Sequence, residues 1–127
     1  MCRKIGHAAT LLILASVRFA HAQPAEPAAL DGEKLFKQQC GACHSVVAGE
    51  SGRQGPNLHG VYERKPGSVE GFHYSGGYEK ADFVWDEPHL DAYLTNPQAV
   101  IPGSIMPYRQ AKAPVRAAII SYLKEQK

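Results

Sequence analysis

The stretch that decides the fold is residues 40–46, CGACHSV, in which a histidine directly follows two cysteines that are three positions apart. A disulfide between Cys40 and Cys43 would close a small loop and stabilise a domain little. A redox-active dithiol with this spacing is expected beside a βαβ pattern, which the sequence lacks. A structural zinc site needs four ligands, and no second Cys/His pair follows. The remaining interpretation is covalent attachment of haem through two thioethers, with His44 as an iron ligand.

The N-terminus has the pattern of a secretory signal peptide over residues 1–22. Two basic residues near the start precede an apolar run at 8–17, AATLLILASV, and AHA at 20–22 has the small-x-small form of a cleavage site. The apolar run is shorter than the roughly 20 residues that a membrane anchor needs. We therefore expect export to the periplasm, with cleavage between Ala22 and Gln23.

Cleavage would change both the charge and the cysteine content. The precursor has 14 Lys+Arg and 12 Asp+Glu, a formal net charge of +2, but three of the basic residues lie in the leader. The mature chain would carry a net charge of −1, so its charge does not imply a nucleic-acid partner. Cys2 would leave with the leader, and the two motif cysteines would remain.

The mature chain has the pattern of one domain, residues 31–127, after a loose Pro/Ala-rich lead at 23–30. Asp31 is placed to cap a helix that runs into the cysteine motif. Residues 49–77 are rich in glycine and show no sustained apolar period, which indicates loops and turns. So long a loop region is unusual in a compact domain, unless a large apolar prosthetic group replaces the missing core.

Helices are predicted again in the C-terminal half. Asp86 is placed to cap a helix that Asn96-Pro97 ends, and a short helix is expected over 97–101. Pro114 begins the helix with the strongest apolar period in the chain. The positions of that period are Val115, Ala118, Ile119, Tyr122 and Leu123. No strand-like alternation competes, so the fold is predicted to be mainly helical.

A second iron ligand is needed, because a motif of five residues can occur by chance. Met106 is the only methionine left after the leader is removed, and it lies in the Pro/Gly-punctuated stretch IPGSIMPY at 101–108. A methionine usually fills a gap in a core. Here its position off any regular helix favours a thioether on iron opposite an imidazole, the His/Met pair of electron-transfer cytochromes. His59, His73 and His89 are rival ligands, of which His73 and His89 have no supporting motif.

At this point the chain resembles the class I c-type cytochromes, mitochondrial cytochrome c and its soluble bacterial relatives. The likeness runs from residue 32 to 127, with an apparent deletion between Met106 and Tyr122. The stretches that carry it are CGACH (40–44), GPNLHGVYERKPG (55–67), GFHYS (71–75), Trp85, YLTNPQAVIPGSIM (93–106) and ISYLKEQK (120–127). The resemblance implies an all-α fold of about four to five helices wrapped around one covalently bound haem c and its iron.

The resemblance also implies a role for each matching residue. Cys40 and Cys43 would hold the haem, His44 and Met106 would bind the iron, and the Pro56 carbonyl would accept a hydrogen bond from His44. The residues expected around the haem propionates and the methionine are Arg64, Tyr74, Trp85, Tyr93 and Ser104. In addition, Gly32 and Phe36 would pack the first helix against the last.

The sequence departs from the family pattern at several positions. Tyr78 stands where mitochondrial relatives commonly have asparagine, and Glu63 replaces a glycine. The lysines that surround the haem edge in mitochondrial relatives are largely missing, and only Arg53 and Lys112 survive. The residues that replace them are Gln39, Gln98, Ala99 and Ile105.

Together these features predict a soluble periplasmic monohaem electron carrier and not an enzyme. Its partners would be redox proteins that dock briefly at the haem edge, such as a membrane cytochrome complex, an oxidase or a periplasmic dehydrogenase. We expect a monomer with no stable membrane anchor. Two alternatives remain: a dedicated electron-accepting subunit of one dehydrogenase, and a haem sensor or peroxidase-like protein in which Met106 does not bind iron.

Overall fold

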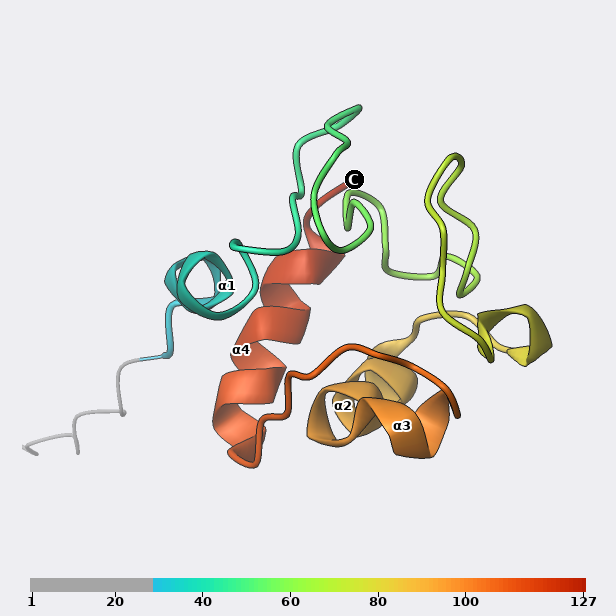
Figure 1. The fold of residues 1–127 in the computed structure, drawn as a ribbon. Coiled ribbons are helices and arrows are strands. Elements are labelled where there is room, and N and C mark those ends of the chain that lie inside the picture. The colour runs from blue at the N-terminus through green and yellow to red at the C-terminus, as the bar shows by residue number, and fades with distance from the viewer. Residues whose placement is uncertain (1–28) are drawn as a thin grey trace, which may run out of the picture.

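The computed structural model describes residues 29–127, so the predicted signal peptide and residues 23–28 of the predicted lead lie outside the described residues. Within them the chain forms helices and loops and no strand, which confirms the all-α class. The elements are α1 (Gly32–Gln39), the 3₁₀ helix η1 (Tyr78–Lys80), α2 (Glu87–Thr95), α3 (Pro97–Val100) and α4 (Ala113–Lys124) (Figure 1). No helix in this part of the chain is long and apolar enough to cross a membrane.

Side-chain caps begin α1 and α2, as the sequence predicts. Asp31 Oδ1 accepts a hydrogen bond from the Lys34 amide at 2.9 Å. Asp86 Oδ1 accepts one from the His89 amide at 2.9 Å. Each cap satisfies an amide at the helix start that has no partner within the helix, and so fixes where the helix begins.

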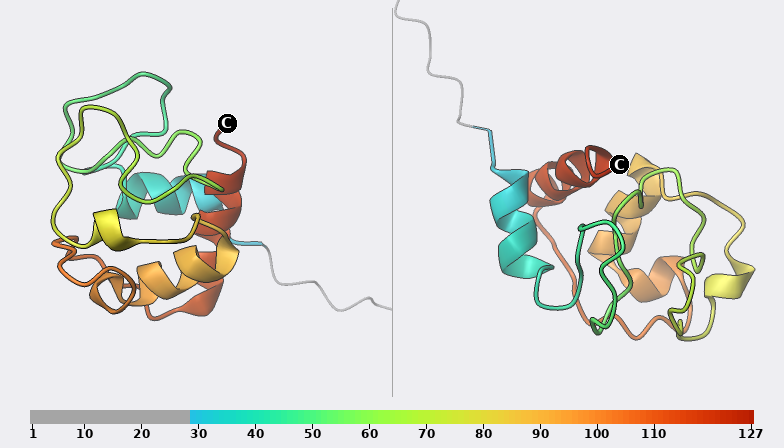
Figure 2. Two further views of the ribbon diagram at one scale, coloured as in Figure 1. Left: turned by 90° about the vertical axis from the view of Figure 1, so that its right-hand side faces the viewer. Right: turned by 90° about the horizontal axis from the view of Figure 1, so that it is seen from above.

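α1 packs against α4 through a very close approach of the two backbones. A β-carbon at Gly32 would collide with the Ala118 carbonyl and the Tyr122 β-carbon. One helical turn further along α1, the rings of Phe36 and Tyr122 lie 5.4 Å apart. The two helices cross steeply (Figures 1 and 2), and this crossing confirms the contact that the resemblance implied.

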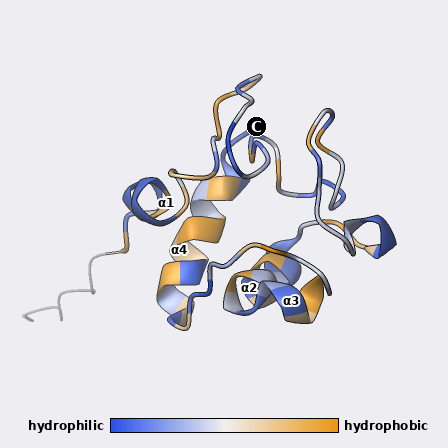
Figure 3. Cartoon of the chain, viewed as in Figure 1, coloured by the Kyte–Doolittle hydropathy of each residue, from blue (hydrophilic) through white to orange (hydrophobic). Residues whose placement is uncertain are grey.

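The helices and a few loop side chains build the buried core. Figure 3 shows hydrophobic bands along α4, where it passes α1 and α2. The buried apolar residues are Phe36, Val61, Ala81, Trp85, Leu90, Tyr93, Leu94, Ile101, Ile119, Ile120 and Leu123. At about 25 cal/mol per Å² of apolar surface removed from water, these side chains supply much of the free energy that opposes chain entropy.

The inner face of α4 is rotated slightly from the predicted one. Ile119 and Leu123 are buried as expected, but Ile120 and Arg116 are buried as well, whereas Val115 is only half-buried. Burial of the arginine is possible because Arg116 binds the Asp91 carboxylate of α2 through two nitrogens, at 2.7 and 3.2 Å. The period of apolar residues cannot predict that a charged residue will be buried together with a partner of opposite charge.

Residues 41–77 form no helix; in Figures 1 and 2 the loops that follow α1 lie at the opposite end of the molecule from α2 and α3, and the last residues of this segment run down to the turn after α3, where Gly77 lies against Pro102. This loop end is tied to the end of the chain, since the Gly60 amide donates to the Gln126 carbonyl. The prediction of loops and turns over 49–77 is confirmed.

Glu63 adopts the left-handed backbone conformation, with φ = 64°. It is the one residue other than glycine with positive φ between residues 29 and 127. A residue with a side chain pays roughly 1–2 kcal/mol to adopt this conformation, and glycine does not. Glycine, however, loses more conformational entropy on folding, which cancels about half of the gain expected from replacing Glu63 by glycine. We expect Glu63→Gly to raise the melting temperature by about 3 °C in thermal unfolding monitored by circular dichroism. Glu70→Gly, at an exposed position without positive φ, should lower it; a decrease in both variants would contradict the assignment of strain.

Candidate haem-binding site

The cysteine motif forms one tight turn directly after α1. The amides of Cys43 and His44 both donate to the Cys40 carbonyl, at 3.0 and 2.9 Å. Both thiols are free and half-buried. Burial raises the pKa of the Cys40 thiol to about 11, so this thiol is protonated at neutral pH. The turn therefore gathers two thiols and an imidazole within five residues.

A backbone cradle formed by Gly55 and Pro56 holds the His44 ring. The Gly55 amide donates to the Cys43 carbonyl at 2.8 Å, and His44 Nδ1 lies 2.8 Å from the Pro56 carbonyl oxygen. A β-carbon built on Gly55 would lie 2.6 Å from Nδ1 and 2.8 Å from Nε2 of the ring. Glycine is therefore required here, because only a residue without a side chain can lie so close to the imidazole.

The cradle also selects the chemical form of His44. A carbonyl oxygen can only accept, so Nδ1 carries the proton and the lone pair of Nε2 is free for a metal. Burial lowers the pKa of His44, although the hydrogen bond to Pro56 acts in the opposite direction. The ring is thus kept neutral, which is the state in which histidine binds metals.

The segment that carries Met106 is anchored by a cluster of hydroxyl groups. The Met106 amide donates to Ser104 Oγ at 3.4 Å, and Ser104 is only 1% exposed. Ser104 Oγ lies 3.0 Å from the Tyr93 hydroxyl oxygen on α2. Burial raises the pKa of Tyr93, so this hydroxyl keeps its proton and can donate a hydrogen bond. Met106 itself is half-buried.

Tyr78 completes this hydroxyl cluster. Its hydroxyl oxygen lies 2.5 Å from that of Tyr93 and 3.2 Å from Ser104 Oγ. In a ring of three hydroxyls each group can donate once and accept once, which satisfies all three without a further partner. The departure from the family pattern at Tyr78 therefore adds a third hydroxyl beside the Met106 segment.

The aromatic and basic residues that the resemblance assigns to the propionates lie in one neighbourhood. Trp85 is buried, and its amide donates to the Arg64 carbonyl at 2.9 Å. The Arg64 guanidinium donates to the carbonyls of His59 and Asn57. Tyr74 packs its ring 4.9 Å from that of Tyr78. Arg64 is half-buried and its pKa is lowered, mainly by burial. A nearby carboxylate would compensate for this cost.

Two of the three rival histidines make contacts elsewhere. His89 Nδ1 lies 2.6 Å from Asp86 Oδ1, and its ring stacks on Phe83. His59 Nδ1 lies 3.2 Å from the Val46 carbonyl oxygen, and His73 is exposed. Between residues 29 and 127, no three His, Cys, Asp or Glu side chains are grouped closely enough to hold a metal ion.

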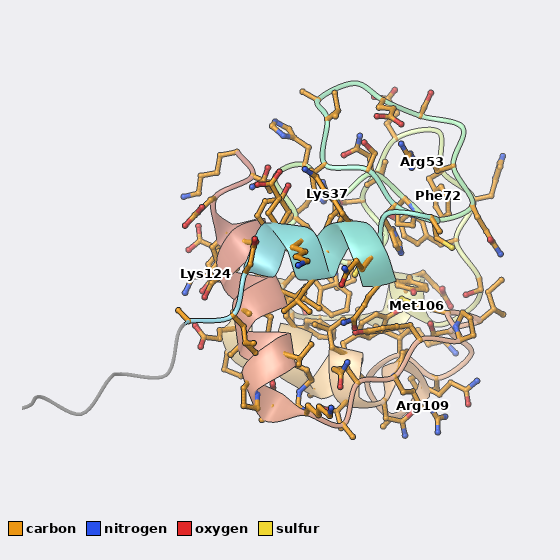
Figure 4. All side chains as sticks on the ribbon, turned by 90° about the vertical axis from the view of Figure 1, so that its left-hand side faces the viewer. Lys37, Arg53, Phe72, Met106, Arg109 and Lys124 are labelled. Atoms are coloured by element: carbon orange, nitrogen blue, oxygen red, sulfur yellow. The ribbon has the colours of Figure 1, made fainter. Side chains whose placement is uncertain are left out.

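The two predicted iron ligands belong to separate clusters. His44 lies in the Gly55–Pro56 cradle and Met106 lies beside the hydroxyl cluster, and no hydrogen bond within the described residues joins the two clusters. Figure 4 shows Arg53, which donates to the Gly41 carbonyl inside the motif at 2.6 Å, and Met106 on different sides of the C-terminal end of α1. Ligands that approach from separate clusters suit a group bound on two faces.

Comparison with known proteins agrees with this geometry. A sequence model of cytochrome c matches residues 29–127, all of the described chain. The chain belongs to the cytochrome c family. Cytochrome c of Ginkgo biloba is 44% identical over 108 residues, which are 84% of this chain and 94% of that protein. Cytochrome c2 iso-2 of Magnetospirillum fulvum is 50% identical over 86 residues, 67% of this chain and 88% of that protein.

Membership in the cytochrome c family implies one covalently bound haem c with its iron, and a role as an electron carrier and not an enzyme. The residues present fit this cofactor. Both motif thiols are free to form thioethers, and the neutral His44 ring has its Nε2 lone pair free. The cradle that a β-carbon at Gly55 would fill is built around that ring.

Sequence reasoning missed two parts of this cytochrome site. Gly55 was one of many glycines in the loop region, and its contact with His44 emerges only when the loop folds back over the motif. Gln39 was expected to be a surface residue at the haem edge, but it is half-buried and accepts two hydrogen bonds. The signal in the sequence that could have indicated a role for Gln39 in the site was its position directly before Cys40.

Proposed function

We propose that this protein is an exported, soluble electron carrier in which His44 and Met106 are the two axial ligands of a single haem c. The observation that carries the proposal is the Gly55–Pro56 cradle, which fixes the His44 ring and leaves Nε2 free. The anchoring of the Met106 segment at Ser104 supports the second ligand. With both axial positions filled by the protein, no position is left for a substrate.

In this proposal haem c supplies a one-electron couple between ferrous and ferric iron. The surrounding residues keep the site the same in both states. Pro56 orients the His44 ring, and Tyr78 and Tyr93 hold Ser104 and with it the backbone of Met106. Buried aromatic side chains such as Trp85 exclude water, which favours the less charged state of the site and raises the potential.

Absorption spectra of the exported, matured protein test the ligand assignment. The oxidised form should show the weak long-wavelength band of iron–thioether bonding, and the reduced form should resist carbon monoxide. Absence of that band, together with immediate binding of carbon monoxide, would favour an open-site haem sensor. The pigment should also stay with the polypeptide under acid–acetone extraction.

Export is proposed from the leader pattern at residues 1–22. Intact-mass measurement of protein from the periplasmic fraction should give a chain that begins at Gln23 and carries the mass of one haem. A chain that retains Met1, or that stays in the cytoplasm without pigment, would contradict it.

At the proposed docking surface around the haem edge, neutral residues stand at several positions where mitochondrial relatives carry lysines. Gln98 and Ala99 are exposed on α3, and Ile105 beside Met106 is 81% exposed. Arg53, one of the two surviving basic residues, is paired with Glu50 at 2.6 Å. Contact with a redox partner would depend on short-range interactions, and transient redox encounters typically bury less than about 1,200 Å² of surface.

We expect the rate of electron exchange with a redox partner to depend weakly on salt. A nearly neutral surface cannot steer an encounter strongly by charge. In stopped-flow measurements the second-order rate constant should change less than about tenfold between roughly 0.01 and 0.2 M ionic strength. A steeper fall with added salt would show that charge attraction guides docking.

A further inference from the structure

Gln39, the last residue of α1, is linked to the segment that follows Met106. Its side-chain oxygen Oε1 accepts a hydrogen bond from the Tyr108 hydroxyl at 2.5 Å. The same oxygen accepts a second from Gln110 Nε2 at 3.0 Å. We call these three side chains the Gln39 clasp. The clasp connects the residue directly before Cys40 to the second and fourth residues after Met106.

Gln110 fixes the other side of the clasp to the core. Its amide donates to the Leu94 carbonyl at the end of α2, at 2.8 Å. Its carbonyl accepts from Arg116 Nη1 at 2.9 Å, and Arg116 is held by the Asp91 carboxylate. Gln110 is thus bound to α1, α2 and α4 at once, so the clasp joins Gln39 to a rigid point.

The position of the clasp connects it with the iron ligand. Only six residues, 107–112, lie between Met106 and the start of α4. Ser104 anchors this segment before Met106, as described above, and the clasp anchors it after Met106. Met106 is therefore held between two fixed points, and loss of one of them would let the sulfur move away.

We propose that Gln39 is a positioning residue for the distal iron ligand: the clasp closes the Met106 segment against the haem-attachment turn and keeps the methionine sulfur on the iron. The proposal rests on the proposed function, in which Met106 is that ligand. Mitochondrial relatives carry a docking lysine at this position, whereas here the side chain of Gln39 accepts hydrogen bonds from within the protein. Lysine has no acceptor, whereas both Tyr108 and Gln110 donate a hydrogen bond to residue 39 here.

The test compares variants that keep or remove the acceptor at residue 39. Gln39→Met removes the acceptor but keeps nearly the same length, and Gln39→Glu keeps an oxygen acceptor in the same place. Gln38→Met is the matched control, because Gln38 is an exposed neighbour on α1 with no side-chain hydrogen bond within the described chain. Each variant is prepared as full-length, haem-loaded protein.

The readout is the affinity of the ferric protein for imidazole, which competes with the methionine sulfur. We expect Gln39→Met to bind imidazole about tenfold more tightly than the parent, equivalent to about 1.4 kcal/mol. Gln39→Glu and Gln38→Met should stay within about twofold of the parent, on the same scale. An unchanged affinity in Gln39→Met would overturn the proposal. So would a Gln39→Glu variant that behaves like Gln39→Met, because the side chain would then act through packing alone.

Tyr108→Phe gives a second measurement that keeps the aromatic ring. Removal of its hydroxyl should accelerate hydrogen exchange of the backbone amides at 105–112 relative to the parent, while Tyr62→Phe should not. Unchanged exchange in Tyr108→Phe would count against the clasp whatever the ligand is. A parent protein that lacks the iron–thioether band but shows the accelerated exchange in Tyr108→Phe would instead remove Met106 from the iron and leave the clasp in place.

Discussion

Gly55→Ala should lose most of the covalently bound haem during maturation, or bind it with the His44 ring displaced. The added β-carbon would lie 2.6–2.8 Å from the ring nitrogens of His44, closer than real contacts of this kind allow. Either the ring rotates and breaks its hydrogen bond to Pro56, or the loop moves away and opens the cradle. Loss of such an orienting partner weakens metal binding about 10- to 100-fold in other metalloproteins.

The measurement is the yield of haem-stained protein per total polypeptide, together with the absorption spectrum of whatever matures. Gly76→Ala is the matched control, because a β-carbon there meets nothing within 4 Å and the residue lacks positive φ. We expect a reduction of about tenfold or more for Gly55→Ala and no change for Gly76→Ala. A Gly55→Ala protein with normal yield and spectrum would show that the loop of Gly55 and Pro56 can move to accept a side chain without displacing the His44 ring.

Gly32→Ala should destabilise the fold strongly, although it lies outside the haem site. The new methyl group would run into the Ala118 carbonyl and the Tyr122 β-carbon of α4. Helix backbone cannot give way as a flexible side chain can, so α1 and α4 must separate and the contact between Phe36 and Tyr122 must loosen. Overpacking of this kind costs roughly 1–3 kcal/mol.

For a domain of this size that cost corresponds to a melting temperature about 5–20 °C lower. Thermal unfolding of the haem-loaded protein measures it, again with Gly76→Ala as the control. Alanine is a better helix former than glycine, so local propensity alone predicts a slight stabilisation. An unchanged or raised melting temperature would therefore mean that the helices do not meet as closely at residue 32 as the structure has them.

The helices were predictable because their signals are local. Asp31 and Asp86 each cap a helix by accepting a hydrogen bond from the amide three residues further on. Asn96-Pro97 marks the boundary between α2 and α3. Loops over 49–77 were predictable for the same reason. The motif at residues 40–44 pointed to haem because its chemistry is contained in five consecutive residues.

Contacts between distant segments were not predictable from local pattern. The ion pair between Arg116 and Asp91 joins two helices, and neither residue carries a signal that it has a partner. The hydroxyl of Tyr78 reaches Ser104 across 26 positions of sequence. Such contacts depend on how the loops close, and the composition of a loop does not specify that closure.

The hydrogen bond between the Gly60 amide and the Gln126 carbonyl ties the loop after His59 to the residues that follow α4. Proteolysis that removes Lys127 and Gln126 would take away one of the hydrogen bonds that hold the loop of His59 and Arg64, whose guanidinium donates to the His59 carbonyl. Preparations that contain partly trimmed chains would then differ in the stability of this loop, even where their haem content is equal. Checking the intact mass of each preparation guards against reading such a difference as an effect of mutation.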